Sequence, residues 1–504
     1  MKKIFKEYPL VILLIIAALL IFPNLGNSYL WQDEGETAFI AKNTLKVGYP
    51  LAYDGVNKPQ TMEMYEKTSP QQWYKEPYRY APWLQFYITA ASFKLFGLNT
   101  HAARLPFAIF GLFSIMLIWF LSEEIFAQRT ISIIATLSCV VCIPYILHIR
   151  QCHWYVLVSF FTLWALLSYL QMLKKKRYST LGLILSGILL FHSNHGIFIP
   201  VFLGIGLHYL TFAAKELKIT SLMIAAIVIA IFCFPFLYLL SGSEFAAGFD
   251  TVHIRHQIEY YMRMINKWVF PWAALFNIWL FASIFKRRFK WFLKSQPQGV
   301  YLLICVIFTT ILFLIIPKVR AFRYINHLIP LLLILQARIL LGWIKSSKKL
   351  ATIGIALILF TNVFTMGAPF LKPIRILLTE YIYELTHDYD GPVEGIVVYL
   401  KENAKPGDTV KINYGDLPLM FYTDLRVDNR PFRETETYPQ WIVYRRDWVG
   451  SDFFKTDYGK KVLAGYEKIV LDYPDTRWHN RPDPNEHRFR TAGQQPKLEI
   501  YKKR

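Results

Sequence analysis

The residues best suited to chemistry lie near the start of the chain, in the stretch Trp31-Gln32-Asp33-Glu34-Gly35-Glu36. An apolar run from Tyr8 to Phe22, long enough to cross a membrane and followed by Pro23, ends a few residues earlier. Carboxylates are costly where a chain leaves a bilayer unless charge is needed there. One interpretation is a solvated acidic turn at a helix end. The other is a carboxylate held at the membrane surface as a general base.

Two basic stretches have residue types that suit an anionic partner. Guanidinium groups bind phosphate oxygens in a bidentate manner and stay charged at every relevant pH. We therefore predict a phosphate-binding site formed by Lys318, Arg320, Arg323 and Tyr324, with anchoring to lipid headgroups as the alternative. Arg150, close to His153 and Tyr155, forms a second cluster. Its alternative is an arginine that extends from a helix end toward the membrane surface.

Two histidine patterns have spacings compatible with metal ligands on one helical face. They are His192-x-x-His195 and His253-x-x-His256-x-x-Glu259. Such pairs are common by chance, so we interpret them as polar residues lining a wet cavity and predict no metal site. His195 is then a candidate substrate contact. The five cysteines lie in or beside apolar runs and give neither a disulfide framework nor a zinc pattern.

These residues must be positioned by a chain of membrane helices. Of 504 residues, 54% are hydrophobic and 17% aromatic, and the mean hydropathy is positive. Apolar runs of membrane-spanning length recur between short basic clusters, which is typical of a polytopic helical membrane protein. We predict about 11 spans, near 8–24, 104–121, 131–148, 154–173, 179–192, 196–212, 219–240, 268–285, 299–316, 324–342 and 349–366. Residues 83–96 are too short and too polar for a span and are predicted to form a juxtamembrane helix.

The distribution of charge orients this arrangement. The net charge is +21, and most of the excess Lys and Arg falls in loops that are cytoplasmic if the N-terminus is cytoplasmic. This distribution satisfies the positive-inside rule at every inner segment except the acidic loop 122–130, and it gives no indication of nucleic-acid binding. The long loop 25–103 and the polar tail then lie outside. The tail contains strand-like runs at 396–398, 409–412 and 468–471 between helical stretches, which predicts a small α/β domain. We expect domains at 1–370 and 378–504.

Four local patterns together resemble the GT-C superfamily of integral membrane glycosyltransferases, in the branch of protein O-mannosyltransferases and the lipid A aminoarabinose transferase. The first is Asp33-Glu34 outside the first span, followed by residues 39–50. The second comprises Ala81-Pro82-Trp83-Leu84-Gln85, residues 93–97 and Ala102-Ala103-Arg104-Leu105-Pro106. The third is Ile149-Arg150-Gln151-Cys152-His153-Trp154-Tyr155, and the fourth is Arg323-Tyr324 before Pro330. The resemblance covers about residues 1–370.

The resemblance implies a GT-C fold and an inverting glycosyltransferase of the cytoplasmic membrane with its catalytic face outside. Asp33 matches the family's proposed catalytic base, beside Glu34, which is expected to orient an arginine or a second hydroxyl. Glu36 lies where some relatives carry Arg or Tyr, and Arg79 is the candidate phosphate contact from the outer loop. With Tyr155 and His195 these are the candidate substrate contacts. The implied donor is a polyprenyl-phosphate sugar, and the acceptor is a lipid, a glycan or a protein; no cofactor is required.

Two other functions remain open at this point. A transporter or flippase of an anionic polyprenyl lipid would place charged residues near the membrane midplane and often shows internal repeats, whereas here the charges gather on one face. A catalytically inactive GT-C-like scaffold would need no carboxylate at position 33. Transfer of label from a polyprenyl-phosphate sugar distinguishes an enzyme from both.

Overall fold

The computed structural model describes residues 8–59, 76–240, 251–275, 296–316, 320–366, 375–430, 432, 438–446, 451–477, 481–491 and 495–504. The chain divides into two compact units. Unit 1 comprises Met1–Pro23, Arg79–Pro82 and Phe107–Ile382, and unit 2 comprises Asn24–Tyr78, Trp83–Pro106 and Tyr383–Arg504. Most of the predicted first outer loop thus belongs to the same unit as the tail. The units group the chain differently from the two predicted domains, residues 1–370 and 378–504.

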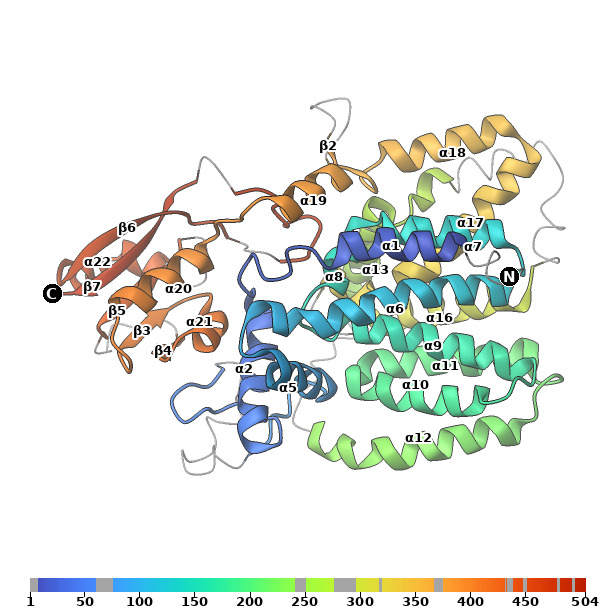
Figure 1. Cartoon of the computed structure of the whole chain (residues 1–504), viewed down its shortest axis with the longest axis horizontal. Coiled ribbons are helices and arrows are strands. Elements are labelled where there is room, and N and C mark those ends of the chain that lie inside the picture. Colours follow the sequence, from blue (N-terminus) through green and yellow to red (C-terminus); the bar gives the residue numbers. More distant parts are fainter. Residues whose placement is uncertain are drawn as a thin grey trace. The chain divides into compact units, whose positions relative to one another are not determined.

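Unit 1 is mainly helical (Figure 1). Its helices are α1 (Tyr8–Ile21), α7 (Arg129–Val140), α8 (Ile143–Ile149), α9 (Tyr155–Leu173), α10 (Ser179–Ser193), α11 (His195–His208), α12 (Ile219–Leu240), α13 (Thr251–Trp268), α16 (Gln298–Leu314), α17 (Leu328–Ser346) and α18 (Lys348–Phe360), with the short helices η2 (Tyr209–Ala213) and η3 (Phe322–Ile325). Strands β1 (Thr365–Met366) and β2 (Arg375–Ile376) pair antiparallel. Helices α6 (Thr100–Phe126) and α19 (Leu377–Thr386) each contribute residues to both units.

The predicted spans correspond to apolar helices. Five helices in the described part of the chain are long and apolar enough to cross a membrane, and a sixth candidate is the bent pair α7 and α8. Shorter apolar helices occupy Tyr8–Ile21, Ser179–Ser193, Gln298–Leu314 and Ala351–Phe360. The predicted span 268–285 lies mostly outside the described residues. The apolar helices and the small C-terminal sheet agree with the predicted fold class, a polytopic helical membrane protein with a small C-terminal α/β domain.

One predicted span is broken. Residues 131–148 were expected to form one helix, but α7 and α8 meet at an angle of 69°. Cys142, which precedes α8, has φ −78° and ψ 87°, outside the helical region, and Pro144 follows in the first turn of α8. Proline has no N–H to donate to the preceding turn, and its ring crowds that turn, so a bend is favoured here.

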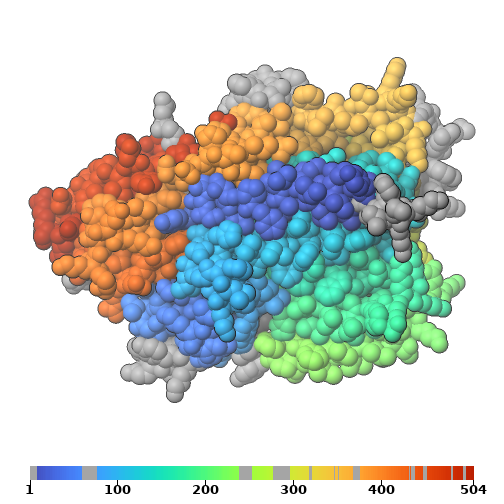
Figure 2. All heavy atoms as spheres, in the orientation of Figure 1, coloured from blue at the N-terminus to red at the C-terminus, as the bar shows by residue number. Residues whose placement is uncertain are grey.

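The helices of unit 1 pack in pairs. Helix α9 packs against α10, α10 against α12, and α11 against α16 (Figure 1). Helices α11 and α16 approach closely at Gly204, where a Cβ would lie 2.6 Å from Val306 Cα, so only glycine fits there. On α12 many apolar side chains point outward, Ile224, Ile231 and Phe234 among them, and this helix forms one edge of unit 1 (Figure 2). This exposure suits a helix that faces lipid.

Unit 2 combines helices with a five-stranded sheet. Its helices are α2 (Gln32–Val47), α5 (Leu84–Phe96), α20 (Pro392–Asn403), α21 (Asp416–Tyr422), η4 (Ser451–Lys455) and α22 (Asp457–Ala464). The strands are β3 (Thr409–Ile412), β4 (Arg426–Asp428), β5 (Trp441–Tyr444), β6 (Tyr466–Pro474) and β7 (Lys497–Lys503), in the order β4-β3-β5-β7-β6. Strands β4, β3 and β5 are parallel, and β7 is antiparallel to β5 and β6.

Three of the local predictions for this unit are confirmed and one is wrong. Residues 83–96 form a helix, and the strands predicted at 409–412 and 468–471 lie in β3 and β6. Residues 396–398, predicted as a strand, lie instead in α20. The buried apolar residues Val393, Ile396, Val397 and Leu400 follow the helical period, and Pro392 begins the helix. The β-branched residues 396–398 favour a strand when they are considered alone, and the helical period becomes visible only over the longer stretch 392–403.

Candidate functional site

The acidic stretch opens a helix, α2, whose start is defined by its own residues. Trp31 precedes the helix in an extended conformation, and Asp33 and Glu34 lie in the first turn. The Glu34 carboxylate accepts the main-chain N–H of Trp31 at 3.4 Å, as the third residue of a capping box does. Carboxylates are favoured here because the helix N-terminus carries partial positive charge. Gly48, with φ 87°, ends the helix.

Glu34 is fully buried and paired with Arg104. The guanidinium binds both carboxylate oxygens, Nε to Oε1 at 2.8 Å and Nη2 to Oε2 at 2.7 Å. Arg104 also donates to the carbonyl oxygens of Leu25 and Ser28 at 2.8 and 2.9 Å. This pair ties the chain before α2 to the first turn of α6. Glu34 is thus bound to an arginine, Arg104, within the protein.

Asp33, one position earlier, lies in a different environment. Its side chain is half-buried, and its charge raises the pKa of two neighbouring groups. Burial, together with the charges of Asp33 and Asp416, raises the pKa of Glu36 to about 7, although the hydrogen bond donated by Tyr78 opposes this shift. Burial and the Asp33 charge also raise the pKa of Tyr414. Asp33 and Asp416 thus both act electrostatically on Glu36 and Tyr414.

The tail holds α2 in place through α21. Gln32 Nε2 donates to Asp416 Oδ1 at 2.6 Å, and Asn429 Nδ2 donates to Asp416 Oδ2 at 2.7 Å. The two helices approach so closely that a Cβ at Gly35 would lie 2.6 Å from the Pro418 nitrogen. Gly35 is therefore required by the close approach of α21.

The parallel part of the sheet brings polar residues to the same region. Asp416, Asn429 and Arg445 follow the carboxyl ends of β3, β4 and β5, the edge where open α/β sheets commonly bind ligands. Arg445 is fully buried and donates to Asp475 Oδ1 at 2.7 Å. Sequence reasoning missed Asp416, Tyr78 and Tyr414. Nothing local marks them, because Asp416 meets Gln32 across more than three hundred residues of chain.

A second group of predicted site residues comes together in unit 1. The start of α9 and η3 form a cation–aromatic cluster, which we define as His148, His153, Trp154, Tyr155, Phe322, Arg323 and Tyr324. Trp154 stacks on Tyr324 with ring centroids 6.0 Å apart, and the Arg323 guanidinium carbon lies 5.6 Å from the centre of the Tyr324 ring. Tyr155 is fully buried against His148 and His153. Arg323 and Tyr324 are half-buried, and the preceding Arg320 is exposed.

Arg150 has a different setting in the same unit. Nη1 donates to the Tyr381 hydroxyl at 2.8 Å, and Nη2 donates to the Pro23 carbonyl at 2.6 Å. The Tyr381 hydroxyl in turn donates to the Leu20 carbonyl at 2.6 Å. Arg150 thus joins the end of α1 to α19, and two of its three nitrogens are engaged within the protein.

The remaining predicted residues lie apart from these groups. Half-buried Arg79 lies in the short segment Arg79–Pro82 of unit 1, and His195 begins α11. Lys318 lies outside the described residues. Among the residues that the structure describes, no group of three or more His, Cys, Asp or Glu is arranged to hold a metal ion. The ring centroids of His192 and Phe236 lie 4.4 Å apart, and His253 Nε2 lies 3.3 Å from Gln257 Nε2.

The chain is similar to known membrane glycosyltransferases. Residues 80–239 match the sequence model of the family described as dolichyl-phosphate-mannose-protein mannosyltransferase. ArnT from Cupriavidus metallidurans bound to undecaprenyl phosphate has a similar structure, with a TM-score of 0.58, 15% identity and coverage of 98% of each chain. Its apo state matches with a TM-score of 0.56 and 14% identity over 98% of this chain and 97% of that chain.

The fold is shared more widely. The Archaeoglobus fulgidus oligosaccharyltransferase tethered to an acceptor peptide matches with a TM-score of 0.52 and 12% identity, over 87% of this chain and 61% of that chain. No curated protein sequence matches. The predicted resemblance to the GT-C superfamily is confirmed by the family match and by the ArnT fold, and the apolar helices make the chain a multi-pass membrane protein.

Proposed function

We propose, from the GT-C fold that this chain shares with ArnT along nearly its whole length, that it is an inverting glycosyltransferase. It moves a sugar from a polyprenyl-phosphate donor to an acceptor at the outer face of the cytoplasmic membrane. The ArnT structure of similar fold holds undecaprenyl phosphate, and the matching family is described by a dolichyl-phosphate-linked sugar. A donor with a polyprenyl tail stays in the bilayer, so its sugar reaches water only at the membrane surface.

Asp33 is the general base of this proposal. As the acceptor attacks the anomeric carbon, Asp33 takes its proton, the bond from the anomeric carbon to the phosphate oxygen breaks, and the configuration inverts in one displacement. The observation that carries the assignment is the contrast between adjacent carboxylates. Glu34 is fully buried by Arg104, whereas half-buried Asp33 is the one left accessible. Glu34 is thus a positioning residue that fixes the helix turn on which Asp33 lies.

The leaving group is a polyprenyl phosphate, whose charge grows as the bond breaks. Arg323, with Arg320 beside it in the chain, is proposed to stabilise that charge by donors that are already in place. Tyr324 supports the Arg323 guanidinium by its ring. Arg150 is engaged by Tyr381 and Pro23, and its proposed contribution is positive charge close to the same helix ends. We propose contacts to the remainder of the substrate for Arg79, Tyr155, His195 and Glu36.

The test is transfer of label from a radiolabelled polyprenyl-phosphate sugar in membranes that contain the full chain. Asp33→Asn keeps the shape of the side chain and removes its basicity, so we expect transfer to fall by about 10²–10⁴-fold while purified protein retains the labelled donor as before. Asp388→Asn, an exposed aspartate of the same unit, is the matched control and should leave transfer unchanged. Substantial turnover by Asp33→Asn would remove Asp33 from the role of base.

A further inference from the structure

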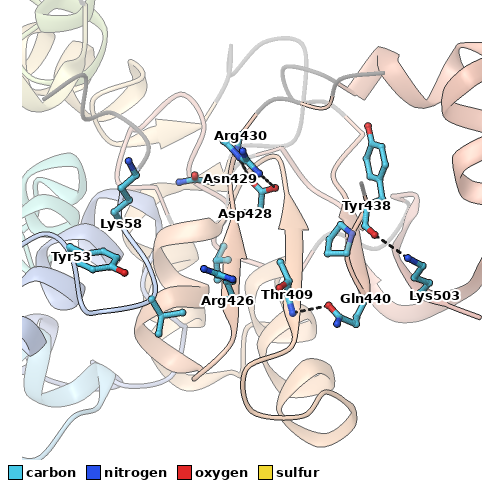
Figure 3. A pocket seen from close by; sticks show the side chains of 13 residues that line it. Tyr53, Lys58, Thr409, Arg426, Asp428, Asn429, Arg430, Tyr438, Gln440 and Lys503 are labelled. Carbon is cyan, nitrogen blue, oxygen red and sulfur yellow. Dashed lines mark hydrogen bonds and ion pairs between the residues drawn. The ribbon is translucent and has the colours of Figure 1, made fainter. Parts of the chain in front are cut away.

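Unit 2 contains a pocket that the proposed reaction does not use. Its volume is about 590 Å³, within the range of roughly 300–1,000 Å³ typical of small-molecule sites. It extends along the edge strand β4, from Arg426 at its start to Asp428 at its end. Tyr53 and Lys58 of the first outer loop lie on one side of the pocket, and the segment around Tyr438 lies on the other (Figure 3).

The loop side of the pocket is fixed to the strand by its backbone. Asn57 Nδ2 donates to the Leu425 carbonyl at 2.8 Å, and its Oδ1 accepts the Val427 N–H at 2.8 Å. The side chain of Asn57 thus replaces a neighbouring strand on this part of β4, which is at the edge of the sheet. The pocket is therefore a built feature of the unit.

The lining is strongly cationic. Among the described lining residues, four carry positive charge, namely Lys58, Arg426, Arg430 and Lys503, and one, Asp428, is a carboxylate. Asp428 is shared by two cations, buried Lys411 at 3.0 Å and Arg430 at 2.9 Å. Burial alone would raise its pKa, but the bonds from Arg430 and the charge of Lys411 hold the pKa of Asp428 below its usual value. Its charge is thus already compensated within the protein.

Two of the cations have no anionic partner within the described part of the chain. The exposed Arg426 side chain makes no hydrogen bond or ion pair with the described residues. Within the described ranges, the hydrogen bond of the Lys503 ammonium goes to the Tyr438 carbonyl oxygen, at 3.4 Å. In Figure 3 Arg426 lies between the Lys58 side and the Lys503 side of the pocket. A ligand with a phosphate or carboxylate group would satisfy these cations.

The other lining groups suit a saccharide. Tyr53 and Tyr438 offer aromatic surface, and the amides of Asn429 and Gln440 offer polar atoms. A small number of polar groups set among aromatic surface is the usual composition of a site for a polar organic ligand. A free phosphate ion would leave most of the 590 Å³ unfilled. The combination favours an anionic group attached to a sugar.

The pocket is also connected to the candidate base. Asn429, which lines it, donates to Asp416 Oδ2, and Gln32 donates to Asp416 Oδ1. Gln32 is the neighbour of Asp33 in the first turn of α2. A hydrogen-bonded path through the Asp416 carboxylate therefore runs from the pocket to the first turn of α2.

We infer that this pocket is a docking site for a saccharide that bears a phosphate or carboxylate group. The site holds a part of the acceptor glycan that is not itself modified. The role as acceptor docking rests on the proposed function, whereas the binding does not.

The experiment measures binding of glucose 6-phosphate to the purified full chain by titration calorimetry. Arg426→Gln and Lys503→Gln each remove one cation, and we expect each to raise the Kd about ten-fold. Lys502→Gln is the matched control, because Lys502 is adjacent on β7 but its ammonium lies 5.3 Å from the Trp441 ring, away from the pocket. It should leave the Kd unchanged. Equal melting temperatures of the variants show that both cations act on the ligand and not on folding.

Three further probes separate the sources of the anion. Glucose without phosphate should bind at least ten-fold more weakly, and inorganic phosphate should also bind more weakly than glucose 6-phosphate. The inference would be overturned in favour of a lipid headgroup by two results together. Binding to phosphatidylglycerol vesicles would depend on Arg426 and Lys503, and binding of glucose 6-phosphate would not. An unchanged Kd in both single variants and in the double variant would also overturn it.

The outcome is distinguishable from failure of the proposed function. Asp33→Asn should bind glucose 6-phosphate like the unmodified chain. Binding that depends on the two cations, in a protein that transfers no label, contradicts the proposed function and leaves the binding site standing. Label transfer in membranes, together with glucose 6-phosphate binding that does not depend on the two cations, supports the proposed function and contradicts the binding site.

Discussion

Two regions of the molecule hold charged side chains with different kinds of partner. One is the acidic start of α2 in unit 2, and the other is the cation–aromatic cluster together with Arg150 in unit 1. Each contains two residues of one charge sign, Asp33 and Glu34 in the first region and Arg150 and Arg323 in the second. In each, one of them is fixed by the protein. Glu34 is held by Arg104 and Arg150 by Pro23 and Tyr381, while Asp33 and Arg323 stay partly accessible.

The two regions differ in the kind of partner that holds the buried residue, Glu34 in the first region and Arg150 in the second. Glu34 has a full counter-charge in Arg104, so its own charge is cancelled locally. Arg150 is held by a carbonyl and a hydroxyl, which are neutral, and its Nε has no partner among the described residues. The acidic region therefore has one carboxylate, Glu34, whose charge is cancelled by an arginine, and one half-buried carboxylate, Asp33. In the basic region the hydrogen bonds that Arg150 donates to Tyr381 and Pro23 go to neutral groups. A single proton acceptor suits the first region, and stabilisation of an anion suits the second.

The largest effect should come from breaking the buried pair. Glu34→Gln leaves Arg104 buried without its counter-charge, which we expect to lower the free energy of unfolding by about 3–5 kcal/mol. Thermal unfolding of the purified chain measures this loss. Glu402→Gln, an exposed glutamate on α20, is the control. A change of less than about 0.5 kcal/mol in Glu34→Gln would show that the pair does not hold this region together.

The second effect concerns the proton on Glu36. Its folded pKa of about 7 lies above the usual value of 4.5 for a glutamate, so the folded chain binds more protons than the unfolded chain between these pH values. Stability therefore falls as pH rises from about 4.5 to about 7, by up to about 3 kcal/mol. Unfolding of the chain measured across this pH range tests the slope. Glu36→Gln should flatten it, and a slope equal in both proteins would assign it to other groups.

The contact between α2 and α21 gives a third, smaller effect. Gly35→Ala places a methyl group 2.6 Å from the Pro418 nitrogen, and a backbone atom cannot move away as a side chain can. We expect a loss of about 1–3 kcal/mol and a fall in transfer, since the shift moves the turn that carries Asp33. Gly206→Ala, where a Cβ would meet nothing within 4 Å, is the control. Unchanged stability in Gly35→Ala would mean that the helices approach less closely.

Local patterns predicted much of this molecule because the signals were long or chemically distinct. Apolar runs marked the helices, whereas helix α2 was not predicted, and a helix end was only one of two interpretations of the acidic stretch at its start. The strand predicted at 396–398 was wrong because three β-branched or small residues fit both periods. The partners of the acidic region were out of reach for another reason. Arg104, Asp416 and Tyr78 contact α2 only through the tertiary fold, and neither spacing nor composition encodes such pairs.

The sequence also does not show which partners Arg150 and Arg323 have, and by sequence alone the two arginines look equivalent. Arg323→Gln removes a half-buried cation that lies on the Tyr324 ring, so the Kd for a polyprenyl-phosphate donor should rise about ten-fold with little change in melting temperature. Arg150→Gln removes the link between α1 and α19, so its main effect should be a lower melting temperature. Donor retention and thermal unfolding, measured on both variants, decide the matter. If both arginines weaken donor binding equally and neither lowers stability, the division into one structural and one accessible charge fails for unit 1. In that case the two regions differ only in the sign of their charge.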